Sequence, residues 1–138
     1  MAELRLPPDF TLQKLTQARR AFESVLGANK VFFEEMDRTT YLDKFAVDDE
    51  AHHPSGAVAC DSVEEVQAVV RIATQYRLPL FPIARGKNLG YGGTAPVLAG
   101  SVVMDLSRMK RIEFDEKLGT VLLEPGVGFY DLYDYLQA

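Results

Sequence analysis

The hydrophobic positions of this chain follow two periods, and each period predicts a different kind of element. Near the N-terminus apolar residues recur at helical spacing, which predicts a helix capped by Asp9 or Thr11, running to about Leu26 and ended by Gly27. A helix with one apolar face needs something to cover it, so we expect this helix to pack on the body that follows. The predicted stripe consists of Leu12, Leu15, Ala18, Phe22 and Val25.

A second helix is predicted where Ser62 and Glu65 form a capping box, in which each side chain bonds the other's free N–H group. Short apolar runs at 57–59 and 80–83 flank it and predict strands, the second of them fully buried. A strand, a helix and a strand in this order predict a βαβ unit with parallel strands. The helix should run from Val63 to about Tyr76 and bury Val63, Val66, Val69, Val70 and Ala73.

The C-terminal third predicts three more strands and a helix. Apolar runs at 101–105, 112–115 and 120–124 predict the strands, and the last two form a hairpin. The final helix, from about Phe129, reaches Ala138 with neither a glycine cap nor a proline, so we expect these residues to be the opening portion of a longer protein. The predicted fold class is therefore α/β (α+β).

The segment between residues 28 and 56 has no clear period beyond residues 31–33, which are either a short strand or the end of a packing segment. Irregular chain of this length inside a compact domain is either a functional arm or a segment laid along a partner surface. Its adjacent His52 and His53 are poorly spaced for one metal ion, and we interpret them as solvated loop residues, with no metal site.

The composition of the chain argues against several classes of protein. The 138 residues carry a formal net charge of −5 with scattered acidic residues, which argues against a nucleic-acid partner. No apolar run has the length of a membrane span, and no apolar signal segment is visible. We therefore expect no membrane partner and a cytoplasmic location. The lone Cys60 excludes an internal disulfide and is predicted to be a buried, inert thiol.

The chemistry concentrates in a glycine-rich stretch between two predicted core strands. From Pro82 to Gly93 it holds four glycines within eight residues, two cations, an amide and Tyr91. Such a loop is either a cradle of backbone N–H groups facing phosphates or a long flexible hairpin. It lacks the Ser or Thr of a Walker loop after Gly86-Lys87, and no helix is predicted after Gly93, so it is not a nicotinamide dinucleotide fingerprint.

With these motifs in view, the chain resembles the N-terminal part of a flavoprotein of the vanillyl-alcohol oxidase and 4-cresol methylhydroxylase family. The resemblance runs from about Pro54 to Ala138 and rests on the helix start at Ser62, the Arg-Gly-Lys-Asn-Leu-Gly-Tyr-Gly-Gly loop at 85–93, the Glu-Pro-Gly-Val turn at 124–127 and the Tyr-Asp-Tyr helix at 133–135. It implies that residues 54–138 are the first lobe of a two-lobed FAD-binding domain, and that residues 1–53 are an N-terminal helix and irregular arm.

The resemblance also assigns site residues. It implies that FAD is bound by Pro82, Ile83, Arg85, Gly86, Lys87, Asn88, Leu89, Gly90, Gly92 and Gly93 on the diphosphate side, and by Glu124, Pro125, Gly126 and Val127 on the adenine side. Tyr91 takes the position that binds the phenolate oxygen of the substrate. From the residues alone Tyr91 could equally cap the flavin pocket, and Arg85 and Lys87 could be solvated loop cations.

Members of the family oxidise para-alkylphenols by transferring a benzylic hydride to FAD. The resemblance implies a phenolic substrate, the remainder of the flavoprotein chain as a partner and a homo-oligomer at full length. Electrons pass to a cytochrome c subunit in some relatives and to oxygen in others, and some relatives are periplasmic. Two alternatives stay open: an FAD lobe acting on 2-hydroxy acids or sugars, and a non-catalytic binding module.

Overall fold

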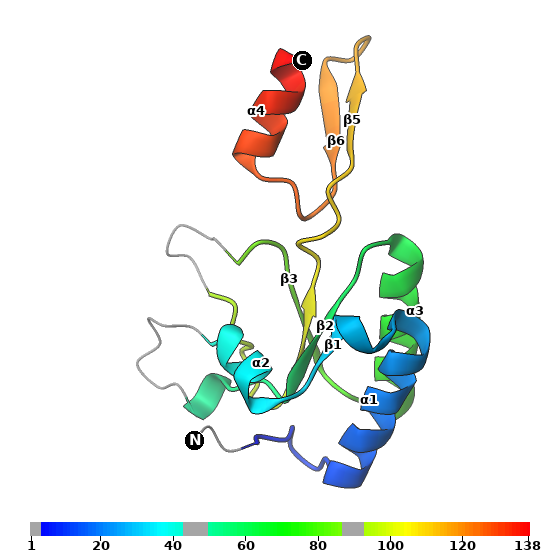
Figure 1. Ribbon diagram of the computed structural model, residues 1–138, viewed down its shortest axis with the longest axis vertical. Helices are drawn as coiled ribbons and strands as arrows, with labels where there is room; N and C mark the ends of the chain where they lie inside the picture. Colours follow the sequence, from blue (N-terminus) through cyan, green and yellow to red (C-terminus); the bar gives the residue numbers. More distant parts are fainter. Residues whose placement is uncertain (1–3, 43–49, 87–92) are drawn as a thin grey trace.

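The computed structural model describes residues 4–42, 50–86 and 93–138, arranged as two bodies (Figure 1). We call the described residues up to 109 the sheet body and residues 110–138 the hairpin unit. The helices of these ranges are all too short or too polar to span a membrane. The elements are α1 (Leu12–Leu26), β1 (Val31–Phe32), α2 (Glu35–Thr40), β2 (Gly56–Ala59), α3 (Val63–Tyr76), β3 (Leu80–Ile83), β4 (Val102–Asp105), β5 (Ile112–Asp115), β6 (Thr120–Leu123) and α4 (Phe129–Gln137), with 3-10 turns at Ala28–Lys30 and Glu50–His52.

The sheet body is organised around a four-stranded sheet of order β1-β2-β4-β3. Strands β2, β4 and β3 are parallel, and β1 is antiparallel to β2. The strands of the predicted βαβ unit are thus parallel but not adjacent, because β4 lies between them. Val102 and Val103 of β4 are fully buried, as expected of a central strand covered on both faces.

Side chains alternate between two cores across this sheet. Val102 and Met104 face the larger cluster, which α1 and α3 cover with Leu15, Phe22 and other side chains, while Val103 faces a smaller cluster on the opposite side. Figure 1 shows α1 and α3 together on one side of the sheet and α2 on the other. The expectation that the N-terminal helix packs on the following body is confirmed.

Local signals set the helix boundaries correctly but overstated their buried stripes. Thr11, not Asp9, caps α1 by accepting a hydrogen bond from Lys14 N, and Gly27 ends the helix with positive φ. Four residues predicted to be buried are exposed, because each helix covers the sheet with a narrower face than the pattern implied. They are Leu12, Val25, Val63 and Val70.

The α3 cap differs from the predicted box in one bond. Ser62 Oγ accepts from Glu65 N at 3.2 Å as predicted, but the Glu65 carboxylate accepts from Asp61 N at 2.7 Å and not from Ser62 N. Glu65 also pairs with Lys30, which draws its carboxylate toward the start of β1. The helix ends at Arg77, which adopts a left-handed conformation.

Strand β3 was predicted to be fully buried and is instead a partly exposed edge strand. The carbonyl of Pro79 accepts a hydrogen bond from Val102 N, and the carbonyl of Ile83 accepts one from Leu106 N. The backbone groups of alternate residues along this segment therefore point toward β4. Pro82 falls on the outward-facing register, where its missing N–H breaks no ladder bond.

The segment predicted to be irregular contains the short helix α2. Its first turn is capped reciprocally by Glu34 and Asp37, a polar signal that carries no apolar stripe. The ring of His52 bonds the carbonyl of Pro96 at 3.0 Å and is half-buried, so the interpretation as a solvated loop residue was wrong. Cys60 is buried as predicted, and burial raises the pKa of its thiol to about 11.

The hairpin unit confirms the predicted β5–β6 hairpin and the helix from Phe129. Strands β5 and β6 pair only with each other among the described residues, and neither they nor α4 contain a buried side chain. In Figure 1 the unit projects from the end of the sheet body to which β4 leads.

Candidate functional site

Three parallel strands end at the same level, and the glycine-rich loop leaves from there. Ala59 and Ile83 both pair in register with Asp105, the last residue of β4. In open parallel sheets, ligands bind in the crevice outside the carboxyl ends of the strands. The loop therefore starts at the edge where such a crevice forms, and the hairpin unit stands on the same side.

The loop joins two adjacent parallel strands, β3 and β4. Two parallel strands cannot be connected by a hairpin, so the interpretation of the glycine stretch as a hairpin was wrong. No helix follows Gly93 before β4 in the described chain, which agrees with the exclusion of a nicotinamide fingerprint.

The two ends of the loop meet closely at Gly86. Its φ is +65°, and a Cβ at this position would lie 2.3 Å from the Cγ2 atom of Thr94. Glycine is required here both for the backbone conformation and for the space. The methyl group of Thr94 packs against Gly86, and the left-handed backbone of Gly86 is the kind found in the concave N–H sites that bind phosphates, so the described start of the loop fits the cofactor that the resemblance implies.

Half of the predicted diphosphate residues lie outside the described residues, as does Tyr91. The five diphosphate residues are Lys87, Asn88, Leu89, Gly90 and Gly92. Gly93, at the far end of the loop, is half-buried beside Thr94.

The two residues predicted from the end of β3 lie in different surroundings. Ile83 is buried in the smaller core cluster with Ala57 and Val103. Pro82 is exposed on the outer edge of the sheet. Arg85 behaves differently, because its guanidinium leaves the sheet body and bonds Asp131 in the first turn of α4 at 2.9 Å.

The Glu124–Val127 turn fastens the hairpin unit to the sheet body. Gly126 N donates to the carbonyl of Met109 in the sheet body at 2.7 Å, and within the hairpin unit Glu124 Oε2 accepts from Arg111 N at 2.7 Å. A Cβ on Gly126 would lie 2.3 Å from the carbonyl oxygen of Ser107, so only glycine fits. Pro125 is exposed, and Val127 N donates to the Glu124 carbonyl. These contacts define the structure of the turn. Its role on the adenine side of FAD stays a prediction.

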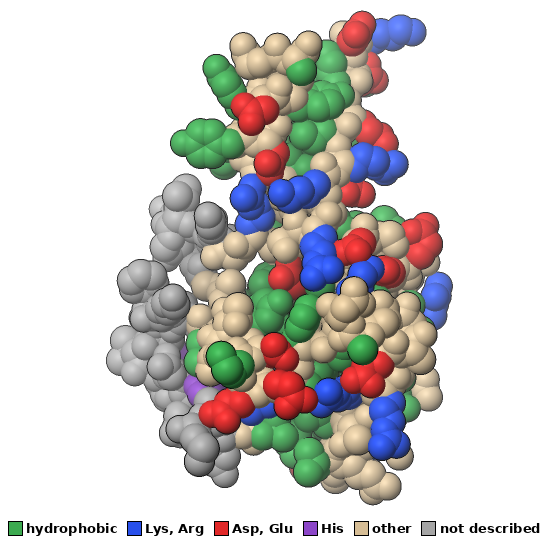
Figure 2. Space-filling view, viewed as in Figure 1, with side chains coloured by type: hydrophobic (Ala, Val, Ile, Leu, Met, Phe, Trp, Pro, Cys, Tyr) green, Lys and Arg blue, Asp and Glu red, His purple; other side chains and the backbone are tan. Residues whose placement is uncertain are grey.

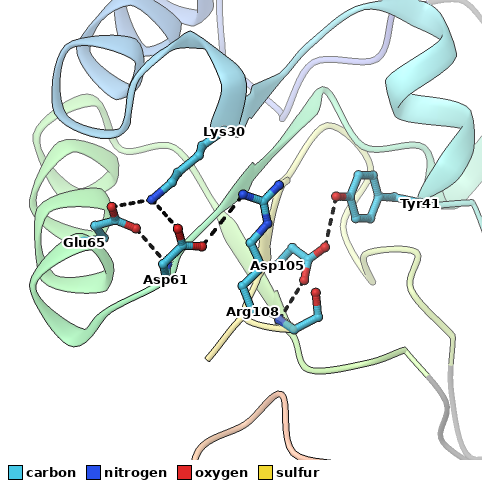
Figure 3. A network of polar contacts seen from close by, with 7 residues as sticks. Lys30, Tyr41, Asp61, Glu65, Asp105 and Arg108 are labelled. Atoms are coloured by element: carbon cyan, nitrogen blue, oxygen red, sulfur yellow. Dashed lines mark hydrogen bonds and ion pairs between the residues drawn. The ribbon is translucent and has the colours of Figure 1, made fainter. Parts of the chain in front are cut away.

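Polar side chains connect the residues that follow the strand ends (Figure 3). Asp105 accepts from the hydroxyl of Tyr41 at 3.1 Å and from Ser107 N at 2.8 Å. Burial, and then the charge of Asp105, raise the pKa of the Tyr41 phenol well above its ordinary value, so this hydroxyl stays protonated and acts as a donor. Nearby, Lys30 pairs with Asp61 and Glu65.

Positive charge collects where the two bodies meet. Figure 2 shows Lys and Arg side chains gathered at this neck. The pKa of Asp131 is lowered, first by the hydrogen bond from Gly128 N and then by the charges of Lys110 and Arg85, so both cations lie close to this carboxylate. Asp131 and Lys110 were not predicted as site residues. The Gly128-x-x-Asp131 spacing, typical of a capped helix start, was the available signal.

Comparison with known proteins agrees with this geometry. Residues 54–138, more than half of the chain, match the model of the FAD binding domain family. The chain is 38% identical over 134 residues to the flavoprotein subunit of 4-cresol dehydrogenase (hydroxylating) from Pseudomonas putida, covering 96% of this chain and 26% of that protein. It is 39% identical over 125 residues to a 1'-carboxy-chondrochloren decarboxylase from Chondromyces crocatus, covering 90% of this chain and 23% of the relative.

The fold comparison gives the same family. A crystal structure of p-cresol methylhydroxylase with substrate bound superposes with a TM-score of 0.91 at 38% identity, over 96% of this chain and 26% of that one. The chain therefore spans about a quarter of the length of the relatives it matches. Its cofactor is FAD, and the chain belongs to the FAD-binding flavoproteins of the vanillyl-alcohol oxidase and 4-cresol methylhydroxylase family.

Proposed function

We propose that this chain is the first lobe of the FAD-binding domain of an enzyme that oxidises para-alkylphenols. The observation that carries the proposal is the 38% identity to the 4-cresol dehydrogenase subunit across nearly the whole chain. The Gly-Tyr-Gly-Gly ending of the loop and the Tyr-Asp-Tyr segment of α4 support the phenolic substrate class.

The proposed role of the glycine loop is to hold the FAD diphosphate with bare backbone amides. The left-handed backbone of Gly86 supports this role, since it is the conformation that turns successive N–H groups toward an anion. Lys87, Asn88 and the glycines up to Gly93 complete the proposed cradle. FAD, when bound, supplies the acceptor for the hydride that leaves the substrate.

Tyr91 is the proposed phenolate-binding residue. A hydroxyl that donates to the phenolate oxygen favours the charged form of the substrate and so lowers its pKa. The phenolate in turn stabilises positive charge at the benzylic carbon as hydride departs, in a site preorganised for that charge.

The remainder of the flavoprotein chain is the proposed partner of the hairpin unit. The hairpin unit exposes more large apolar side chains than a solvent-facing helix and hairpin would, and further chain is the expected cover because the relatives are about four times longer. These side chains are Phe114, Leu118, Leu122, Leu123, Phe129, Tyr130, Tyr133, Tyr135 and Leu136. A homo-oligomer, a cytoplasmic location and an oxygen or cytochrome c acceptor complete the proposal.

The visible spectrum of the full-length natural polypeptide that contains this chain tests the function. We expect an oxidised flavin spectrum that is bleached by 4-alkylphenols under anaerobic conditions. A flavin that phenols leave unchanged and 2-hydroxy acids reduce would support the hydroxy-acid alternative. A colourless protein that takes up no added FAD would support the binding module.

Substitution of Tyr91 tests its role separately. Tyr91→Phe should lower the rate of flavin reduction by phenols while the flavin content stays that of the wild type. Loss of flavin in this variant would assign Tyr91 to cofactor binding. Tyr76→Phe, a tyrosine at the end of α3, is the matched control and should change neither quantity.

Decarboxylation is a second candidate, because the 1'-carboxy-chondrochloren decarboxylase is as similar to this chain as the cresol enzyme. Release of carbon dioxide from a carboxylated substrate, with no bleaching by 4-alkylphenols, would favour it.

A further inference from the structure

A single arginine connects the start of the glycine loop to the first turn of α4. Arg85 follows β3 by two residues, and its Nη1 atom lies 2.9 Å from Oδ2 of Asp131, which is 46 positions further along the chain. A Cβ placed on Gly128 would lie 2.1 Å from the same Nη1 atom. The guanidinium therefore occupies the space that any side chain at the helix N-cap would need.

The carboxylate of Asp131 is shared between the two bodies. Its Oδ2 atom accepts from Gly128 N at 2.8 Å, which caps α4, and from Arg85, which belongs to the sheet body. The same oxygen thus fixes the helix start and the loop start relative to each other.

This arrangement limits what Arg85 can do for a bound diphosphate. Its Nη1 atom already donates to a carboxylate, whose negative charge offsets part of what the guanidinium could offer a phosphate. The pair is also only partly buried, with side-chain exposures of 39% for Arg85 and 36% for Asp131. Such pairs contribute little to overall stability, so the contact is better suited to positioning the loop than to holding the fold together.

We infer that Arg85 is a positioning residue that clamps the start of the FAD loop to the N-terminus of α4 through Asp131. The clamp keeps Gly86, the next residue, in its positive-φ conformation at the start of the loop. The inference rests on the proposed function, because it takes the glycine loop as the diphosphate site.

A double-mutant cycle on FAD affinity in the full-length protein tests the clamp. The variants are Arg85→Gln, Asp131→Asn, which keeps an oxygen acceptor for Gly128 N, and the two together. We expect each single change to weaken FAD binding by about tenfold, the size of an ordinary pairwise coupling, and the double variant to be no weaker than either single one. Quenching of flavin fluorescence on reconstitution of the apoprotein measures the dissociation constants.

Two results would overturn the inference. If Arg85→Gln weakens binding while Asp131→Asn leaves it unchanged or tightens it, Arg85 is a direct phosphate ligand. If the variants lower the thermal midpoint of the apoprotein and leave FAD affinity unchanged, the pair is structural only. Arg71→Gln, which removes an exposed arginine that bonds Gln67 on α3, is the matched control and should change neither.

Failure of the clamp is distinguishable from failure of the proposed function. A wild-type protein that does not bind FAD contradicts the proposed function itself. A wild-type protein that binds FAD, with an additive cycle, contradicts the clamp alone.

Discussion

The sheet body and the hairpin unit achieve their structure by different means. The sheet body buries its apolar side chains between α1, α3 and the sheet, and Phe22, Val58 and Val102 are fully enclosed. The hairpin unit buries none of its strand or helix side chains, and its described contacts to the sheet body include the hydrogen bond from Gly126 N to Met109 and the ion pair between Arg85 and Asp131. A two-stranded hairpin is only marginally stable alone. The difference therefore indicates that the sheet body supplies the folding free energy and that the hairpin unit depends on its neighbours.

The largest expected effect comes from emptying the core of the sheet body. Phe22→Ala should lower the free energy of unfolding by about 3–5 kcal/mol, because it leaves a cavity in a fully buried site. Phe114→Ala, in β5 and partly exposed, is the control and should cost about 1 kcal/mol or less. Chemical denaturation followed by circular dichroism measures both, and equal losses would contradict the comparison.

A smaller effect should follow from crowding the joint between the two bodies. Gly126→Ala places a methyl group against the carbonyls of Ser107 and Met109 and should cost about 1–3 kcal/mol. Amide hydrogen exchange should quicken in β5 and β6 while β4 stays protected. Gly119→Asn, at an open left-handed position in the hairpin turn, is the control, and uniform exchange across both bodies would show that they are one cooperative unit.

Removing a helix cap should cost less again. Ser62→Ala removes the acceptor for Glu65 N and should cost about 1 kcal/mol, spread over the whole sheet body because α3 is packed into its core. Ser62→Asp keeps an acceptor and should restore most of the loss in thermal denaturation. Local fraying of α3 with no change in the global midpoint would contradict this expectation.

The smallest expected effect is a response of α4 to acid. The hydrogen bond from Gly128 N, with help from Lys110 and Arg85, lowers the pKa of Asp131, so its contribution is present above the ordinary aspartate pKa of about 3.9 and is lost as pH falls through the lowered value. The amide resonance of Gly128 should titrate with a midpoint below that of an ordinary aspartate. In Arg85→Gln the midpoint should rise, and an unchanged midpoint would mean that the arginine adds nothing to the cap.

Elements with local signals could be predicted from the sequence. The Ser62 cap and the apolar repeat after it define α3 from Val63 to Tyr76, and the Gly119 turn defines the hairpin. These features depend on neighbours within one or two turns of chain, so the residues themselves carry the information.

Features that depend on distant pairing could not be predicted in the same way. The place of β4 between β2 and β3 reflects competition among strands for the most buried position, which periodicity does not rank. The short helix α2 has polar caps and no apolar stripe, so its residues have the pattern of irregular chain. The Arg85–Asp131 pair joins residues that no spacing rule connects.

In the candidate site, too, one feature had a local signal in the sequence and others had none. The glycine loop was recognisable because several glycines between two apolar runs lose much backbone entropy on folding, which indicates that the backbone geometry there requires them. The structure confirms this requirement for Gly86. The roles of Tyr91 and of the other loop residues up to Gly92 stay predictions, since they lie outside the described residues.

Pro82 has a consequence for how this chain behaves before it is fully assembled. An open strand edge is a template on which other chains can add and aggregate, and natural proteins often interrupt such edges with proline. With no N–H to offer on the outer side of β3, Pro82 denies an incoming strand a regular ladder. During synthesis, the exposed edge of β3 could thus be solvent-accessible without pairing with strands of neighbouring chains and aggregating.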